Sequence, residues 1–182
     1  KHTEAALRES QLRTQLLVHA SNIGLWDWDL VTHDVFFSPE WKQQLGHTDE
    51  DLPNRYEEWE RRLHPEDREA TLDAVKAYIG GRRADYDVEF RLRHRDGSWR
   101  WILTRADLTR DAAGTPVRMM GCHIDITSRK WAETDLRDAR DQLQAAVSGG
   151  NVGLWDRDLR TNKIRFSPEW KQQIGYADDE IP

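Results

Sequence analysis

A long internal repeat constrains this chain more than any other feature of its sequence. Residues 24–53 (GLWDWDLVTHDVFFSPEWKQQLGHTDEDLP) return 129 positions later as residues 153–182 (GLWDRDLRTNKIRFSPEWKQQIGYADDEIP), with 18 of 30 aligned residues identical. This spacing indicates a duplicated unit of domain size, because solenoid motifs repeat at about 20–50 residues. We therefore expect one complete module, a connector and the start of a second module.

The composition favours a modest core that is rich in aromatic side chains. Of the 182 residues, 37% are hydrophobic and 33% are charged, but nine are tryptophans. Each tryptophan ring can bury a large apolar area, which offsets the shortage of aliphatic residues. The length is that of one domain of common size, about 100–150 residues, with additional segments.

Charge and cysteine content exclude several classes of protein. The net charge of −6 disfavours nucleic-acid binding, which normally needs a basic surface. No apolar run approaches the roughly 20 residues of a membrane span, and the N-terminal residues lack a signal-peptide core. Cys122 is the only cysteine, so an internal disulfide is excluded and a reducing compartment fits. We expect a cytoplasmic fragment without a membrane segment, whose parent could still be anchored elsewhere.

Two helix-forming segments, residues 3–20 and 129–147, occupy equivalent places in the repeat. In the second, apolar residues follow the 4-3 spacing of a coiled-coil seam: Ala132, Leu136, Ala139, Leu143 and Ala146. The alternative is an amphipathic helix packed on its own domain. Leu7, Leu17, Leu136 and Leu143 are the candidates for helix packing between subunits.

The segment between these helices begins with strands and continues with helices. Residues 25–30 and 34–38 predict two short strands. Ser38 and Pro39 then predict the start of a helix that reaches Gly46, because serine caps a helix and proline suits its first position. Further helices are predicted at residues 56–63 and from Pro65 to residue 79, where two glycines end the second one.

Three antiparallel strands follow. Residues 86–93 alternate apolar and polar side chains, which indicates a strand with one buried face. Asp96-Gly97 predicts a hairpin turn, because glycine tolerates a positive φ there. The return strand is expected at residues 98–106, a turn at 111–116 and a last strand at 117–126. This order of elements predicts an α+β fold.

The motifs in this order resemble a PAS domain of the fold-3 type with its C-terminal PAC segment. They are W-D-x-D, F-S-P-E-W, H-P-E-D, R-x-R-x-D-G-x-x-x-W with His94 inside it, and G-x-x-x-D-I-T-x-R-K. The resemblance covers about residues 22–130 and again 151–182. It implies a five-stranded antiparallel sheet of order 2-1-5-4-3 with short helices on one face. The expected organisation is a linker helix (1–20), the domain (21–130), a connector helix (131–148) and the start of a second domain (149–182).

The resemblance also implies a function. Such domains sense signals or dimerise upstream of histidine kinases or diguanylate cyclases in bacterial two-component and related proteins. We expect a non-catalytic module in a homodimer, linked to an output domain; the chain has no P-loop, nucleophile elbow or metal cluster. The alternative is a ligand-free structural spacer.

Two cofactors known in this family lack their motifs here. Flavin photochemistry needs a cysteine in a G-x-N-C-R-F-L-Q helix segment, whereas Cys122 lies on the last predicted strand. Haem-binding members use a histidine within the long helix, and residues 65–79 contain none. No cofactor is predicted, although an unidentified small molecule could still bind.

By resemblance to flavin-binding members, His123 points into the interior, and strand parity then assigns its neighbours. The ligand-pocket candidates are His123, Gly121, Met119, Thr104, Ile102, Leu92 and Phe90. His123 could act as a ligand-binding or proton-sensing group; the simpler alternative is a neutral, buried histidine bonded to Thr104 or a backbone carbonyl. The opposite sheet face carries Trp99, Trp101 and Leu103, for which we expect a cover from residues 3–20 or a partner subunit.

Signal relay is assigned to the end of the last strand. Asp125, Ile126 and Thr127 lie where this strand runs into the connector, and the two polar side chains suit hydrogen bonds at that junction. We expect ligand occupancy or dimer rearrangement to bias the connector between two packings. The alternative is an ordinary strand end with a threonine cap. His64, Asp27, Asp29 and Cys122 are expected to have structural roles.

Overall fold

The computed structural model describes residues 22–150 and 152–180, and it divides into two compact units after Lys130. The predicted linker helix at residues 1–20, with Leu7 and Leu17, lies outside the described residues. No helix in the described part is long and apolar enough to cross a membrane.

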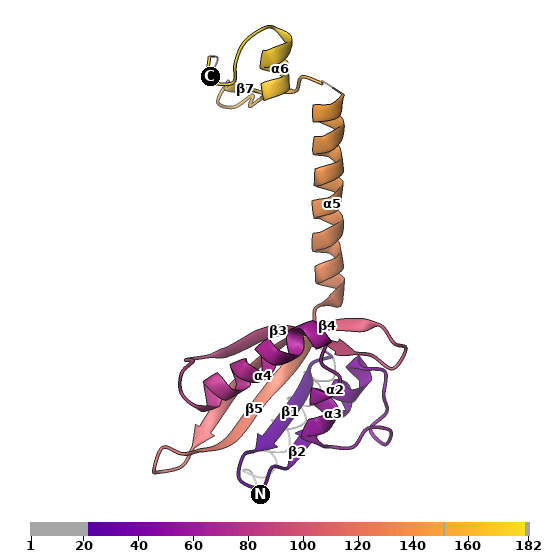
Figure 1. The fold of residues 1–182 in the computed structure, drawn as a ribbon, viewed down its shortest axis with the longest axis vertical. Helices are drawn as coiled ribbons and strands as arrows, with labels where there is room; N and C mark the ends of the chain where they lie inside the picture. Colours follow the sequence, from indigo (N-terminus) through magenta and orange to yellow (C-terminus); the bar gives the residue numbers. More distant parts are fainter. Residues whose placement is uncertain (1–21, 151, 181–182) are drawn as a thin grey trace, which may run out of the picture. The chain divides into compact units, whose positions relative to one another are not determined.

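The first unit contains a five-stranded antiparallel sheet (Figure 1). Its strands are β1 (Gly24–Asp29), β2 (Val35–Phe37), β3 (Tyr86–Arg93), β4 (Trp99–Arg110) and β5 (Pro116–Asp125). Their order is β2-β1-β5-β4-β3, which confirms the predicted α+β fold and sheet order. The last strand of the domain therefore lies at the centre of the sheet, with β1 on one side and β4 on the other.

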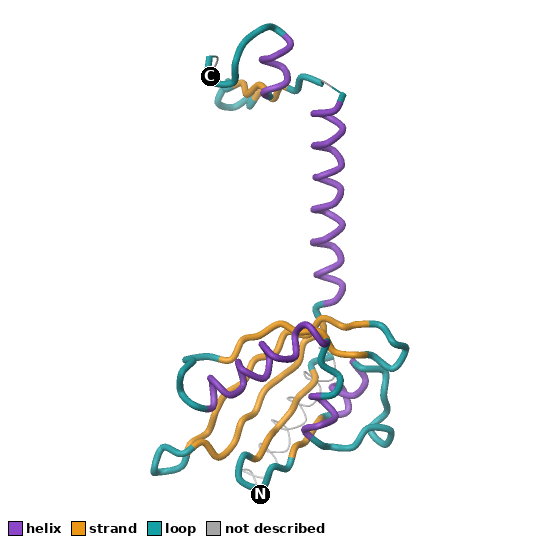
Figure 2. Tube along the Cα trace, in the orientation of Figure 1, coloured by secondary structure: helices purple, strands orange, loops and turns teal. Residues whose placement is uncertain are grey.

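Three helices follow β2 in the chain: α2 (Pro39–Gln44), α3 (Tyr56–Glu60) and α4 (Pro65–Ile79) (Figures 1 and 2). A side chain caps the N-terminus of α2 and of α4 by accepting a hydrogen bond from the first turn. The Ser38 hydroxyl accepts from the Trp41 N–H, and His64 Nδ1 accepts from the Glu66 N–H, with proline next in both cases. The Ser38 cap and the two prolines are the signals that the sequence displays, whereas the His64 cap is seen only in the structure.

The core lies between these helices and one face of the sheet. Strand alternation buries Phe90 and Leu92 from β3, Ile102 and Thr104 from β4, and Met119 from β5. Trp41, Trp59, Val75 and Tyr78 from the three helices belong to the same buried set. Full burial of one large apolar side chain is worth about 1.5–3 kcal/mol, so the aromatic residues dominate this core.

The turn between β3 and β4 agrees with the sequence prediction, whereas the end of β4 does not. The turn contains Gly97 with a φ of +90°, a conformation that favours glycine. The return strand extends to Arg110, beyond the predicted end at Ala106, because its second half continues to pair with β5, as in Leu108 opposite Met119. Pairing with a distant strand thus lengthens β4.

Helix α5 (Thr127–Gly149) follows β5 directly. The seam residues Leu136 and Leu143 are 73% and 65% exposed. The second unit also contains β6 (Trp155–Arg157), β7 (Ile164–Phe166) and α6 (Pro168–Gln173), with β6 and β7 paired as a two-stranded sheet.

Candidate ligand cavity and connector junction

A small cavity lies in the core of the first unit. Its volume is about 40 Å³, enough for about three water molecules at roughly 10–15 Å³ each. The lining residues are Trp26, Trp28, Val35, Phe37, Tyr56, Trp59, Val75, Tyr86, Thr104, Met119 and His123. The cavity is therefore mainly aromatic, with few polar groups.

Strand β1 supplies two of its tryptophans. Trp26 and Trp28 alternate with outward-facing Asp27, and they lie opposite Gly121 and Met119 on β5. A Cβ atom at Gly121 would lie 2.6 Å from the Trp26 ring and 2.3 Å from the Arg105 carbonyl oxygen. Gly121 therefore makes room for the Trp26 ring.

His123 is buried and hydrogen-bonded to α2. Its Nδ1 accepts from the Trp41 indole N–H at 2.7 Å, and its backbone carbonyl accepts from Gln44 Nε2 at 3.0 Å. The expected bond to Thr104 is wrong, because the Thr104 hydroxyl has no partner among the described residues and the Trp41 indole on α2 bonds to the ring instead. Burial lowers the pKa of His123 to about 3, so the ring is neutral at pH 7. With Nδ1 accepting, the neutral ring carries its proton on Nε2.

Several buried polar groups around the cavity have no partner in the described residues. They are the indole N–H groups of Trp26, Trp28 and Trp59 and the hydroxyl of Thr104. Leaving a buried donor unsatisfied costs about 1–3 kcal/mol, and buried polar groups in native proteins commonly bond to ordered water where no side chain reaches them.

The lining carries no charge at neutral pH. It contains no Asp, Glu, Lys or Arg. Burial raises the pKa of Tyr56 to about 12 and also raises the pKa of Tyr86, so both phenols stay protonated. The cavity is thus uncharged, and its accessible walls are almost wholly apolar.

The seven pocket candidates divide into two groups. Thr104, Met119 and His123 line the cavity. Phe90, Leu92 and Ile102 are fully buried elsewhere in the core, and Gly121 underlies Trp26. A binding role for these residues remains a prediction.

Sequence reasoning missed most of the aromatic lining. The alternation of Trp26 and Trp28 on β1, and the i, i+3 spacing of Tyr56 and Trp59 on α3, were the available signals. Trp28 is half-buried and packs on Tyr56, with ring centroids 4.6 Å apart.

The junction between β5 and α5 is held by hydrogen bonds. Asp125 Oδ1 accepts from the Thr127 N–H at 2.8 Å. The buried Thr127 hydroxyl accepts from the Trp101 N–H at 2.9 Å, and the Trp101 carbonyl accepts from the Ile126 N–H at 2.9 Å. The start of α5 is therefore tied to β4 through two bonds to one residue.

Charged groups reinforce the same junction. Glu89 on β3 pairs with Arg129 at 2.6 Å and with Lys130 at 2.5 Å. Hydrogen bonds from Lys130 and then Arg129 hold the pKa of Glu89 below its usual value. Lys130 also lies over the Trp101 ring, 5.1 Å from its centroid. The first turn of α5 thus contacts both β3 and β4.

Charged side chains partly cover the outer sheet face. Trp99, Trp101 and Leu103 are half-buried. Arg93 lies 5.0 Å from the Trp99 ring centroid and Arg91 5.2 Å from that of Trp101, each from the directly opposite position on β3. The proposed cover by residues 3–20 lies outside the described residues.

The remaining motif residues have structural contacts. Asp67 accepts from the Arg91 guanidinium at 2.7 Å and 2.8 Å and from the Arg91 N–H at 2.9 Å, which lowers the pKa of the carboxyl. Asp29 accepts from the backbone N–H groups of Val31 and Thr32 in the turn after β1. Across residues 22–150 and 152–180, no group of three His, Cys, Asp or Glu side chains could hold a metal ion.

Comparison with known proteins agrees with this fold. Residues 34–123 match the sequence model of the PAS fold family. The crystal structure of a sensory box histidine kinase/response regulator from Burkholderia thailandensis is 40% identical, with a TM-score of 0.63; the match covers 72% of this chain and 98% of that one. The N-terminal domain of a diguanylate cyclase with PAS/PAC sensor from Marinobacter aquaeolei is 27% identical over 59% of this chain and 98% of that chain, with a TM-score of 0.53.

Among curated relatives, Sensor protein FixL of Bradyrhizobium diazoefficiens is 34% identical over 71% of this chain and 25% of its own length. The probable diguanylate cyclase DgcE of Escherichia coli is 29% identical over 66% of this chain and 11% of its own length. The chain thus spans a quarter or less of these two relatives. Fold and relatives define a sensory, non-catalytic class of domain found in signal-transduction proteins. The chain belongs to the PAS family.

Proposed function

We propose that this chain is a non-catalytic sensory and dimerisation module that relays changes at its core cavity or dimer interface to α5. The observation that supports this most directly is the position of β5. The strand carries Met119 and His123 at the cavity and then runs through Asp125 into α5. A shift at His123 is thus only two residues from the junction.

In this proposal, the junction between β5 and α5 switches between two packings of the first turn of α5. Thr127 is bonded to both Asp125 and Trp101, while Lys130 and Arg129 share Glu89. A displacement of β5 against β4 would change these bonds together, because the bonds join the two strands to the first turn of α5. Packed elements respond to such changes by switching between discrete arrangements.

A second copy of the chain is the proposed partner of α5. Leu136 and Leu143 are exposed and occupy the same side of the helix in a 4-3 pattern. The N-terminal helix and the outer sheet face would extend this homodimer, and an output domain of a histidine kinase or diguanylate cyclase would receive the signal. The single free Cys122 suits the cytoplasmic location that belongs to this proposal.

The alternative function is a ligand-free spacer. The size of the cavity supports it, because about 40 Å³ holds only a few water molecules. In that case the contacts at the junction between β5 and α5 would only hold α5 rigidly. The helix would then keep one packing whether the cavity is filled or empty.

Cysteine cross-linking tests the dimer. In a Cys122→Ser background, Leu143→Cys places a thiol on the seam, whereas Asp141→Cys places one on the opposite side of the same helix. We expect oxidised dimers to form rapidly for Leu143→Cys and at least tenfold more slowly for Asp141→Cys, read on non-reducing gels. Equal rates would contradict a dimer along this seam.

The relay is tested in the same assay. Thr127→Val removes the acceptor of the Trp101 N–H, and Ser128→Ala is the matched control at the next, exposed position. We expect Thr127→Val to change the cross-linking rate of Leu143→Cys severalfold, and Ser128→Ala to leave it unchanged. An unchanged rate for Thr127→Val at equal stability would exclude the relay.

A further inference from the structure

One buried side chain joins the place where the chain enters β1 to the strand that leads into α5. Gln44, at the end of α2, donates through its Nε2 to the Asn22 carbonyl at 2.6 Å and to the His123 carbonyl at 3.0 Å. A side-chain amide has two donor hydrogens, so both are used. Asn22 precedes β1, and His123 lies near the end of β5.

The Gln44 amide lies where the main-chain pairing of β1 and β5 ends. Gly24 opposite His123 is the terminal pair of that ladder, and Asn22 lies outside the strand. Gln44 bonds to the main chain on both sides of this end. The entering segment and β5 are therefore held together at this point by a residue from a third element, α2.

Helix α2 is itself fixed against both strands. A Cβ atom at Gly24 would lie 2.6 Å from the Trp41 Cα, so the helix backbone contacts β1 closely. The Trp41 indole N–H also donates to the His123 ring at 2.7 Å. Because α2 is held in this way, Gln44 cannot follow a movement of Asn22 by shifting the whole helix. A displaced Asn22 carbonyl would instead turn the Gln44 amide and change its bond to His123.

Burial gives this contact two distinct states. Gln44 is shielded from bulk water, so an amide hydrogen that lost its carbonyl would stay unpaired, which is costly. Asn22 has a φ of +51°, a conformation that asparagine tolerates better than most residues. A change of backbone conformation at Asn22 would therefore move its carbonyl away from Gln44.

We propose that Gln44 is a positioning residue that couples the entry of the chain at Asn22 to β5 and so to the start of α5. A movement of the segment before β1 would reach His123 through Gln44, and then Asp125 and Thr127 along the strand. This input does not need the cavity, because Gln44 does not line it. The inference rests on the proposed function only in taking α5 as the output.

The bridge can be observed in the unaltered chain. In ¹H–¹⁵N spectra at pH 7, we expect the side-chain NH₂ group of Gln44 to exchange with water at least about tenfold more slowly than that of its exposed neighbour Gln43. Equal exchange of the two groups would overturn the proposal, since a buried amide with two acceptors is protected from water.

A substitution at Asn22 supplies the input. Asn22→Ala disfavours the positive φ, whereas Asn22→Gly permits it and is the matched control. The amides of Ile126 and Lys130 report the junction, and those of residues 90 and 102 report global unfolding. We expect Asn22→Ala to speed exchange at the junction about threefold more than at residues 90 and 102, and Asn22→Gly to leave this ratio unchanged. An unchanged ratio in Asn22→Ala would contradict coupling between entry and exit.

Removal of the amide then tests Gln44 as the link. Gln44→Met keeps the length of the side chain and removes both donors, and Gln43→Met is the same change at the exposed neighbour. We expect the selective effect of Asn22→Ala to persist with Gln43→Met and to disappear with Gln44→Met. If the effect persisted with Gln44→Met, the role of Gln44 would be merely structural and the proposal overturned. The exchange of the Gln44 NH₂ group and the Asn22→Ala ratio decide the matter if Gln44→Met does not fold.

The cross-linking of Leu143→Cys separates this inference from the proposed function. Junction exchange that depends on Gln44, with no effect of Thr127→Val on the cross-linking rate, would support the bridge and exclude the relay through Thr127. An effect of Thr127→Val on cross-linking, without any exchange that depends on Gln44, would overturn the bridge alone.

Discussion

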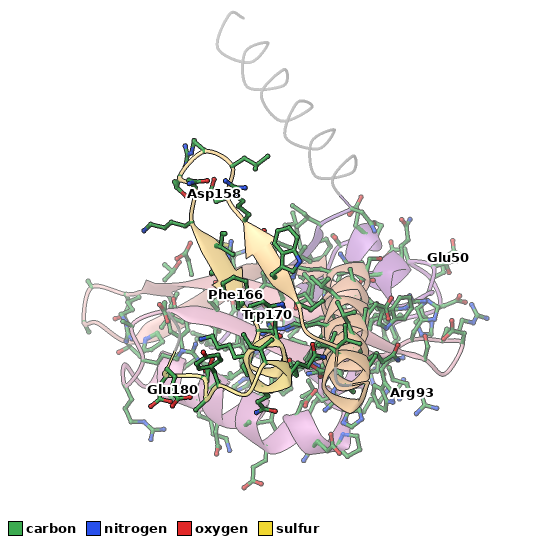
Figure 3. All side chains as sticks on the ribbon, turned by 90° about the horizontal axis from the view of Figure 1, so that it is seen from above. Glu50, Arg93, Asp158, Phe166, Trp170 and Glu180 are labelled. Atoms are coloured by element: carbon green, nitrogen blue, oxygen red, sulfur yellow. The ribbon has the colours of Figure 1, made fainter. Side chains whose placement is uncertain are left out.

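The two copies of the repeat have nearly the same local structure. Ser38 and Ser167 each cap a helix by accepting from a tryptophan N–H, at 3.3 Å and 3.2 Å. The rings of Phe37 and Trp41 stack with centroids 3.9 Å apart, and those of Phe166 and Trp170 at 4.1 Å; Figure 3 labels the second pair. Lys42 pairs with Asp49 as Lys171 pairs with Asp178, at 2.7 Å and 3.0 Å. A strand, a turn and a short helix are thus determined within about 30 residues.

Burial separates the two copies. Val35 and Leu45 are 8% and 1% exposed, whereas their equivalents Ile164 and Ile174 are 42% and 48% exposed. In the first copy, β1 pairs with β5 along Gly24–Asp29; among the described residues, β6 pairs only with β7. The comparison teaches that local sequence suffices for local structure here, while burial requires distant strands.

The largest expected difference between the copies follows from their conserved tryptophans. Trp41→Ala removes a fully buried ring and the donor to His123, so we expect the free energy of unfolding of the first unit to fall by about 3–5 kcal/mol. Trp170→Ala changes a half-buried ring and should lower that free energy by less than about 0.5 kcal/mol. Urea unfolding followed at the amides of residues 90 and 102 measures both. Equal losses would show that the copies do not differ in this way.

The sequence signals were strongest for local features. Pro39 after Ser38, the alternation of residues 86–93 and the Asp96-Gly97 turn each specify an element through its own neighbours. The central place of β5 is a non-local property, and it was inferred from the family resemblance rather than from these patterns. The return strand was predicted too short because its end depends on pairing with β5.

The cavity was harder to predict for the same reason. The inward direction of Trp26 and Trp28 depends on the register of β1 against β5, and Trp41 reaches His123 from 82 positions away in the sequence. Periodicity indicates which face of a strand is buried, but it does not say which distant side chain will meet it. Arg91 and Arg93 likewise cover tryptophans because of cross-strand register.

The bond from Trp41 to His123 has no counterpart in the second copy among the described residues, so pH should change the stability of the first unit through a group that the second copy lacks. We expect this effect to be smaller than that of Trp41→Ala. The folded pKa of His123, about 3, lies below the unfolded value of about 6.5. Above pH 6.5 both states are neutral and the stability is complete. As pH falls from 6.5 toward 3, the unfolded state binds a proton first, so the free energy of unfolding should fall by up to about 1.4 kcal/mol per pH unit.

Urea unfolding at pH 7, 6 and 5 measures this slope before the carboxylates with lowered pKa titrate. His123→Phe should flatten it. His47 is the control, because burial also lowers its pKa and it therefore adds to the same pH dependence. His47→Gln should reduce the slope of the free energy of unfolding against pH by less than His123→Phe does. A slope that survives in His123→Phe would mean that another group carries the effect.

The smallest expected effect concerns the two serine caps, which have the same bonds in different surroundings. Ser38 also accepts from the Leu25 N–H at 3.0 Å, and Ser167 accepts from the Leu154 N–H at 3.1 Å. Since loss of a cap costs about 1 kcal/mol, Ser38→Ala should lower the free energy of unfolding of the first unit by about 1–2 kcal/mol. Ser167→Ala should leave that value unchanged and instead increase amide exchange at residues 168–173. The contradicting result would be that Ser38→Ala only increases amide exchange at residues 39–44 and leaves the free energy of unfolding unchanged. That result would show that the cap stabilises only its own helix in both copies, so that burial against β5 does not distinguish the first copy from the second.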